Sequence, residues 1–280
     1  MVHDGPEYET GVMLGSNLLI SEMPGLLRAI YNIDDVGLDQ ISTGNVIDFL
    51  MEAYEKGMVD RQFLDGIDLK WGSVDATLAM IEKIAARDGV GDLASKGVAA
   101  LSRHIGKGSE TFAIQVKGLE LAAHNIQANP PRGLSYATAE RGACHLSGDT
   151  VEMQNKRAMF DSIGLCLFPT FEPALEQPVL SLLSAITGRE YDKAEFSKAG
   201  ERIFNLEKLF NYREGFRRQD NRLPDRFFQD AFTVGPKKGS VLDRAKFDAM
   251  LTQFYKERGW DPETTEPGPS KLEELGLVSL

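Results

Sequence analysis

The sequence predicts a mostly α-helical, multihelical protein built of two helical subdomains. Apolar residues recur at helical spacing over several long segments, and no convincing run of alternating strand residues interrupts them. A central stretch rich in Gly and Pro, residues 117–145, separates the helical segments into two groups. At 280 residues the chain is long enough for one large domain or two ordinary domains with a substantial core.

Three helices are expected before the central stretch. The first follows a candidate N-cap at residues 42–44, and its apolar pattern continues until Gly57 stops it. The second starts near Ser73, a residue type that favours helix N-termini, and ends before Gly89. A third, shorter helix covers about residues 93–104.

Residues 117–145 are expected to form an ordered loop with short elements. Glycines and prolines break any period there, whereas its aromatic, apolar and small residues favour order. Beyond the loop, helical periodicity predicts helices at about 150–163, 176–188, 191–213 and 241–258, with a short one at 271–275. The side chains expected to point inward from the helix at 191–213 are Ala194, Ala199, Ile203, Leu206 and Phe210.

Composition excludes several classes of function. A net charge of −11 argues against a nucleic-acid-binding surface, which requires a basic face. No apolar run approaches the length of a bilayer span, and the first residues do not resemble a signal peptide. Two cysteines cannot form a disulfide framework, so a reducing compartment is the default. We therefore expect a soluble, acidic, cytoplasmic protein.

A six-residue pattern occurs twice, at residues 34–39 (the first hook) and 161–166 (the second hook). Both read Asp-x-x-Gly-Leu, and the sixth residue is Asp39 in one and Cys166 in the other. A carboxylate, a glycine that permits close backbone approach and a terminal Asp or Cys suit a grip on a two-sided ligand. Each copy alone is better interpreted as a helix-terminal Asp and Gly beside a buried Leu, but the repetition favours the ligand.

Glu9 and His145 are the candidate acid–base residues. Surface glutamates are usually only solvated, but a buried Glu9 would be suited to proton transfer. His145 follows Cys144 directly, and adjacent Cys and His rarely ligate one metal, so a self-contained zinc site is not expected. Neither His104 nor His124 has a comparable setting.

Other chemistry receives weaker support from the sequence. Cys166 is either a buried small apolar residue or a thiolate ligand that awaits partners. Cations in the central loop could hold a phosphate, although loop charges are ordinarily solvated. A nucleophile elbow, a Walker A motif and a strand-borne Gly-x-Gly-x-x-Gly are all missing from the sequence.

The two hooks resemble the paired pterin-contacting motifs of the aldehyde:ferredoxin oxidoreductase family, the tungsten enzymes. Further segments resemble that family in the same order along nearly the whole chain. They are Gly5–Thr10, Ile41–Gly44, Lys117–Glu120, Tyr136–Thr138, Arg141–His145, Leu223–Arg226, Arg258–Asp261 and Lys271–Leu277.

The resemblance implies a fold, a cofactor and a reaction. Residues 1–114 would be a helical domain, the family's middle domain truncated at its N-terminus, and residues 115–280 the helical C-terminal domain. The family holds tungsten, or molybdenum in relatives, between two pterins beside a 4Fe-4S cluster. It oxidises aldehydes to carboxylic acids and passes the electrons to ferredoxin.

Roles for individual residues follow from the same resemblance. Glu9 and His145 would be the acid–base residues beside the metal. Cys166 would be the last of four cluster ligands. The pterin contacts would be Asp34, Leu38 and Asp39 on one side and Asp161 and Leu165 on the other.

The chain departs from the family pattern in two respects. Family members carry a β-rich pterin-binding domain and a Cys-x-x-Cys-x-x-x-Cys triplet before the segment matching Gly5, and this sequence has neither. We therefore expect a truncated or split gene product that needs an N-terminal partner polypeptide and is not active alone. The loop from His124 to Pro131 also differs from the Asp-Pro-Arg motif that is usual in the family.

The other expected partners are ferredoxin and an aldehyde substrate. We expect the protein to bind neither nucleic acid nor a membrane, and a homodimer is one expected assembly. Two alternatives remain open. The chain could be an inactive helical fragment that binds no metal, or a reductase of the same family that acts on an aromatic acyl-CoA.

Overall fold

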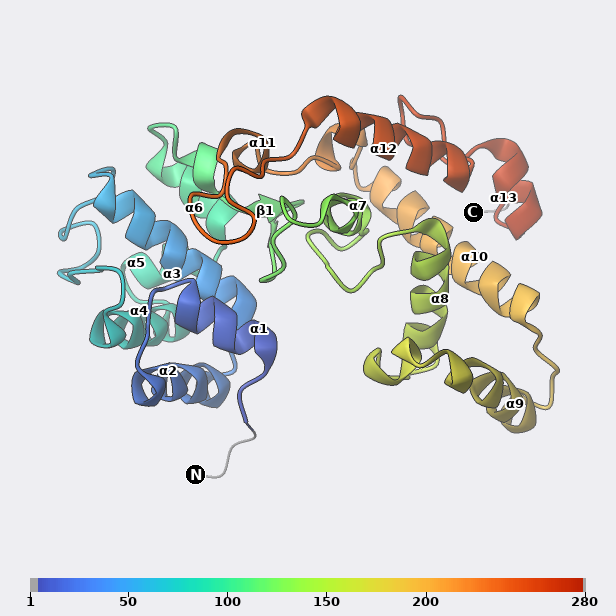
Figure 1. Cartoon of the computed structure of the whole chain (residues 1–280), viewed down its shortest axis with the longest axis horizontal. Coiled ribbons are helices and arrows are strands. Elements are labelled where there is room, and N and C mark those ends of the chain that lie inside the picture. Colours follow the sequence, from blue (N-terminus) through green and yellow to red (C-terminus); the bar gives the residue numbers. More distant parts are fainter. Residues whose placement is uncertain (1–4, 279–280) are drawn as a thin grey trace. The chain divides into compact units, whose positions relative to one another are not determined.

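Helices make up most of residues 5–278, the part of the chain that the computed structural model describes (Figure 1). The prediction of a mostly α, multihelical fold is therefore confirmed. Two compact units divide the chain. Unit 1 runs to Asn125 and also contains Arg141–Ala143 and Leu223–Thr233, and unit 2 contains the remainder. The expected family domains, 1–114 and 115–280, stay a prediction.

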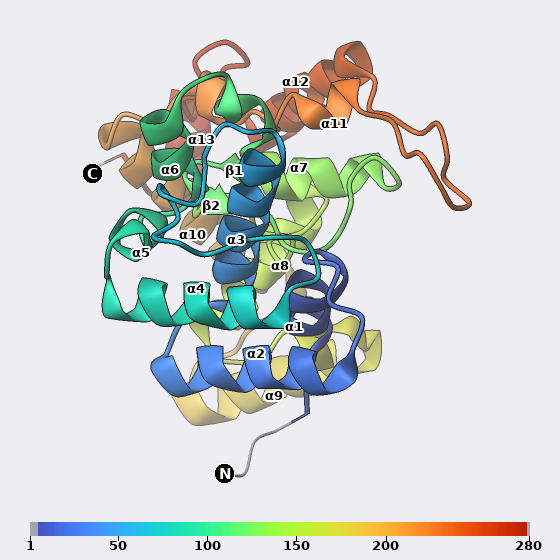
Figure 2. The ribbon, with the colours of Figure 1, turned by 90° about the vertical axis from the view of Figure 1, so that its left-hand side faces the viewer.

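Unit 1 surrounds an apolar core that includes Leu14, Ile33, Leu50 and Ile81, each 0% exposed. Within it, α2 and α4 lie side by side (Figure 2). Its elements are α1 (Tyr8–Gly11), a π-helix (Val12–Ser16), α2 (Met23–Val36), α3 (Gln40–Glu55), α4 (Val74–Ala86), α5 (Val90–Ala94), α6 (Val98–Ile105), a 3-10 turn (Ser109–Phe112), β1 (Gln115–Val116), β2 (Leu119–Glu120) and α11 (Arg226–Gln229).

Two helix starts in unit 1 illustrate the capping rule. Ser73 caps α4 as expected, because its hydroxyl accepts a hydrogen bond from the Ala76 N–H. The N-cap of α3 is Asp39, whose carboxylate accepts from the Ser42 N–H at 2.7 Å, so the expected cap at 42–44 was wrong. The aspartate begins the helix one turn earlier than the apolar pattern does.

Glycine breaks the third expected helix. Residues 93–104 form the end of α5 and most of α6, and Gly97 separates the two helices at φ 83°. A side chain would be strained in that backbone region. The helix α2 was not expected from the sequence, although its 14 residues supply Ile30 and Ile33 to the core.

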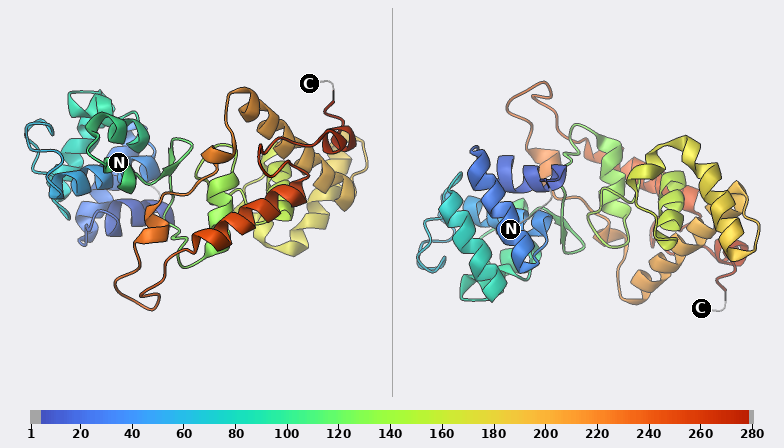
Figure 3. Two further views of the ribbon diagram at one scale, coloured as in Figure 1. Left: turned by 90° about the horizontal axis from the view of Figure 1, so that it is seen from above. Right: turned by 90° about the horizontal axis from the view of Figure 1, so that it is seen from below.

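Unit 2 is built around α8 and α10, which lie side by side (Figure 3). Phe196 of α10 meets Phe160 of α8 edge-on, with ring centroids 5.2 Å apart. The elements of unit 2 are α7 (Pro130–Thr138), α8 (Val151–Ser162), 3-10 turns (Phe168–Phe171, Pro173–Leu175 and Arg218–Asp220), α9 (Glu176–Thr187), α10 (Lys193–Arg213), α12 (Arg244–Arg258) and α13 (Pro269–Leu275).

The inward face expected for α10 was partly wrong. Leu206 and Phe210 are 45% and 55% exposed, whereas Asn205 and Lys208 are almost fully buried. The reason is a close helix contact: a Cβ on Gly200 would lie 1.8 Å from a carbonyl oxygen of α8, so Gly200 must face α8. Phe196 and Phe204, each 3% exposed, lie one turn to either side of Gly200 on this buried face. Asn205 and Lys208 widen it with polar residues, which an apolar pattern does not indicate.

The central stretch is ordered and contains short elements, as expected. β1 and β2 form an antiparallel hairpin, and α7 begins with Pro130 and Pro131, which suit the first turn of a helix because neither needs an N–H partner. Among residues 5–278 the structure contains no helix long and apolar enough to cross a lipid bilayer.

Candidate functional site

The first hook is the junction between α2 and α3. α2 ends in a Schellman motif: Gly37 has φ 70° and its N–H donates to the Asp34 carbonyl at 3.1 Å. The Leu38 N–H donates to the Ile33 carbonyl at 3.1 Å, and the Leu38 side chain packs against the core. Asp39 then caps α3.

The second hook has the same backbone at the end of α8. Gly164 has φ 71° and its N–H donates to the Asp161 carbonyl at 3.0 Å. The Leu165 N–H donates to the Phe160 carbonyl at 3.1 Å, and Leu165 packs against the apolar cluster that includes Phe160. The helix-terminal interpretation thus accounts for the Gly and the Leu of both hooks.

The polar side chains of the hooks remain to be explained. Asp34, Asp39 and Asp161 are all exposed at their helix ends. Cys166 is also exposed, and it is followed by a 3-10 turn instead of a long helix. The hooks therefore differ at their sixth residue: Asp39 has a structural task as a cap, whereas the Cys166 thiol is presented at the surface.

A pocket of about 310 Å³ opens beside the first hook, within unit 1. Leu38 and Asp39 line it together with Glu120. Glu120 is only 4% exposed, and its carboxylate accepts from the Val98 N–H at 2.7 Å and from the Ser42 hydroxyl at 2.8 Å, which offsets the cost of its burial. The Glu120 carboxylate of β2 is thereby hydrogen-bonded to the first turn of α3 and to the first turn of α6 beside this pocket.

Glu9 stands in the first turn of α1 with a side chain 17% exposed. Its Oε2 accepts a hydrogen bond from the Ala123 N–H at 2.7 Å. A second connection joins α1 to the first hook: the Thr10 hydroxyl donates to the Gln40 amide, which in turn donates to Asp34. The Ala123 N–H thus orients the Glu9 carboxylate, and the Thr10 connection ties the helix that carries it to the first hook.

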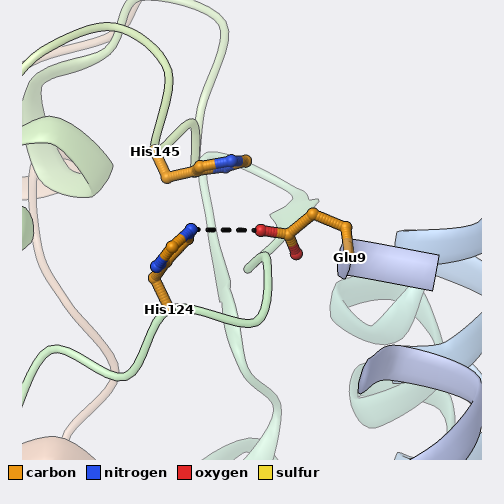
Figure 4. Close-up of side chains that lie close together, drawn as sticks. All are labelled: Glu9, His124 and His145. Carbon is orange, nitrogen blue, oxygen red and sulfur yellow. Dashed lines mark ion pairs between the residues drawn. The ribbon is translucent and has the colours of Figure 1, made fainter. Parts of the chain in front are cut away.

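His124 is the residue that the sequence interpretation missed. Its Nε2 lies 3.4 Å from Glu9 Oε1, as the dashed line in Figure 4 shows. Its ring also lies against the exposed ring of Tyr8, with centroids 5.5 Å apart. More than one hundred residues separate Glu9 from His124, so no local pattern could have indicated the pair.

His145 lies in unit 2, in a loop whose backbone is fixed by both flanking helices. From α7, Arg132 donates to the His145 carbonyl at 2.8 Å and the Ser135 hydroxyl donates to the Cys144 carbonyl at 2.8 Å. Arg132 also pairs with Asp149 at 3.0 Å. From α8, Arg157 donates to the carbonyl of Leu146.

Burial lowers the pKa of the Arg157 guanidinium, since a charge loses hydration when it is enclosed. The imidazole of His145, beside the Tyr136 ring at 6.4 Å, thus projects from a rigid turn. A rigid backbone limits the positions that a proton donor can take.

The fold and these residues define a multihelical protein with carboxylates, an imidazole and a thiol at helix ends and in anchored loops. The chain matches the family model described as aldehyde ferredoxin oxidoreductase, domains 2 & 3, over residues 2–277. It belongs to the aldehyde ferredoxin oxidoreductase family, a family of oxidoreductases.

Similar proteins support this assignment. The chain is 36% identical over 99% of its length to a tungsten-containing aldehyde ferredoxin oxidoreductase of Pyrococcus furiosus, and 35% identical over its whole length to one of Thermococcus kodakarensis. It is 31% identical over 99% of its length to the aliphatic sulfonate oxidoreductase, WOR-like subunit, of Pyrococcus furiosus. The chain spans about half of these relatives: 49%, 49% and 46% of their lengths.

A solved structure has the same fold. The active site complex BamBC of benzoyl coenzyme A reductase, in complex with 1,5-dienoyl-CoA, aligns with 98% of this chain and 49% of its own at a TM-score of 0.76. The sequence identity is 20%, so this likeness concerns the fold alone.

Proposed function

We propose that this chain supplies the C-terminal helical part of a tungsten (or molybdenum) bis-pterin oxidoreductase that oxidises aldehydes to carboxylic acids. The observation that carries the proposal is 36% identity to a tungsten-containing aldehyde ferredoxin oxidoreductase along 99% of the chain. In this proposal ferredoxin is the electron acceptor, the protein is cytoplasmic, and an N-terminal polypeptide completes the site. A homodimer is one assembly to test.

The chemistry of the available donors fits such a group. Asp39 caps α3 through one oxygen and borders the pocket beside the first hook, so its other oxygen remains available for a pterin amine. We assign Asp34, Leu38 and Asp39 to one pterin, and Asp161 and Leu165 to the other. Cys166 offers one surface thiol, and a 4Fe-4S cluster takes four, so the partner polypeptide would provide three.

The metal centre, when bound, would supply a two-electron acceptor. Glu9 would take the proton of the water that attacks the aldehyde, because a carboxylate oriented by a backbone N–H is a competent general base. His145 would hold a proton toward the carbonyl oxygen and so stabilise the charge that develops there. The hydrogen bonds around residues 144–149 would keep that imidazole oriented.

Co-expression with a polypeptide that covers the family's first domain tests the proposal. The joint product should contain tungsten and iron and should reduce a viologen dye when an aldehyde is added. The chain alone should do neither. A stable joint product without either metal would contradict the proposal and would favour the alternative of an inactive helical fragment.

A second candidate changes only the substrate. The relative named aliphatic sulfonate oxidoreductase covers as much of the chain as the aldehyde enzymes do, so membership of the family leaves the substrate open. Aldehydes, an aliphatic sulfonate and an aromatic acyl-CoA should be compared on one preparation. Turnover of the acyl-CoA in the reductive direction, without aldehyde oxidation, would replace the first candidate by the reductase alternative.

A further inference from the structure

The Glu9–His124 pair joins a shielded carboxylate to an exposed imidazole. The Glu9 side chain is 17% exposed, whereas that of His124 is 43% exposed. Because Glu9 Oε2 is occupied by the Ala123 N–H, it is Oε1 that faces His124 Nε2 at 3.4 Å. Contacts between catalytic groups are often this long before a substrate binds, and shorten afterwards.

The segment that carries His124 is anchored to unit 1. Leu121, which is 3% exposed, is buried, and its carbonyl accepts from the Asn45 amide at 2.8 Å. Two residues later the Ala123 N–H donates to Glu9. The Tyr8 ring lies beside the His124 imidazole. The backbone beside His124 is therefore anchored to helices α1 and α3.

A general base that is shielded from water must lose its proton before it can act again. Imidazole gains and loses a proton readily near neutral pH, which makes histidine the usual side chain for proton transfer to solvent. Of the two partners, His124 is the one with access to solvent water and buffer.

We infer that His124 is a proton-relay residue that carries protons from Glu9 to solvent. The inference rests on the proposed function, in which Glu9 takes a proton from water. The protonated Glu9 then gives this proton to neutral His124 at Nε2, and the imidazolium releases it to water or buffer. Both residues return to their starting states, and the metal centre of the proposed enzyme would be the acceptor for the two electrons of the oxidation.

Chemical rescue of the joint product tests the relay. His124→Ala should lower kcat about 10-fold or more in dilute buffer, within the range of proton-transfer catalysis. Added imidazole should restore most of this loss, because it can accept the proton in place of the missing ring. Glu9→Ala should be inactive with or without imidazole. His104→Ala removes an exposed histidine elsewhere in unit 1 and should behave like the unaltered protein.

Two results would overturn the relay. One is an unchanged kcat for His124→Ala, and the other is a loss that imidazole does not restore while the metal content stays normal, which would indicate a structural role.

A measurement on the chain alone separates the pair from the proposed function. Glu9→Gln should alter the ring-nitrogen chemical shifts of His124 in NMR spectra, and leave those of His104 unchanged. If the unaltered joint product is inactive, the proposed function and the relay both fail, whereas altered His124 shifts would still establish the pair. Unaltered shifts would contradict the pair itself.

Discussion

Asp48 of α3 is a carboxyl whose protonation links the stability of the fold to pH. Burial and the neighbouring Glu52 carboxylate raise its pKa to about 7, against smaller opposing effects of Asn17 and Arg226. In the unfolded chain an aspartate ionises near pH 4. Between these values the folded protein keeps a proton that the unfolded chain has lost, so stability falls as the pH rises from about 4 to 7.

Asp48→Asn should therefore stabilise the protein above pH 7 and have little effect near pH 4. Asparagine carries no charge to desolvate and none to repel the Glu52 carboxylate. Since one pKa unit corresponds to about 1.4 kcal/mol, the expected gain in unfolding free energy at pH 8 is about 2–4 kcal/mol. Urea unfolding at several pH values measures it, with the exposed Glu82→Gln as control. Equal pH profiles for Asp48→Asn and the unaltered chain would contradict the assignment.

At the scale of residues, the sequence predicted candidates and could not predict their pairs. Local motifs indicated Glu9 and Cys166, and the structure shows a hydrogen bond from Ala123 to Glu9 and an exposed Cys166. His124 was dismissed, because its partner comes from the other end of unit 1. The roles assigned to the site residues remain predictions until the variants are measured.

At the scale of elements, Glu9 depends on the packing of the π-helix Val12–Ser16 that follows it. Single turns of π-helix occur often at functional sites. Here, α3 approaches this turn so closely that a Cβ on Gly44 would lie 2.7 Å from the Met13 carbonyl oxygen. The glycine of the phrase Ile41–Gly44 is therefore required by a backbone contact.

Gly44→Ala should disturb this contact and move the element that carries Glu9. Alanine favours a helix over glycine by about 1 kcal/mol, but the clash should outweigh this and lower the unfolding free energy by about 1–2 kcal/mol net. Gly11→Ala is the matched control: nothing lies within 4 Å of the place that its Cβ would occupy, so stability should be unchanged or raised. Thermal unfolding compares the two. A stabilised Gly44→Ala variant would show that α3 can move away without cost.

Element types were easier to predict than element ends and faces. Periodicity identified the long helices, because a buried stripe needs apolar residues every third or fourth position. Asp39 caps the start of α3, and Gly97 separates α5 from α6 by its positive φ. Gly200 permits the close approach of α10 to α8. None of these effects changes the apolar pattern that the prediction used.

At the scale of the whole molecule, the chain order and the two units do not coincide. The segment Leu223–Thr233 belongs to unit 1, although its flanking residues belong to unit 2. Arg226 fixes it there, since its guanidinium pairs at 2.7 Å with Glu52 of α3, a residue that is 8% exposed. The motif Leu223–Arg226, which resembles the family, thus stabilises unit 1 through Arg226. Spacing along the sequence could not indicate this contact.

The two cysteines differ in their surroundings and should differ in function. Cys144 is 5% exposed, and its carbonyl accepts from Ser135 in the loop of unit 2. Cys166 is exposed at the end of the second hook. Of these two cysteines, only Cys166 ligates the cluster in the proposed enzyme. A cluster that loses one of its four thiolate ligands is bound less tightly.

Cys166→Ala in the joint product should therefore lower bound iron several-fold and stop electron transfer to ferredoxin. Because the thiol is exposed, its removal leaves no cavity, and the thermal unfolding of the chain alone should not change. Cys144→Ala should show the opposite pattern, with iron retained and stability lowered by about 1 kcal/mol through loss of a buried group. If iron analysis finds a full cluster in Cys166→Ala, the second hook has no ligand role, and its cysteine must be explained by the helix end alone.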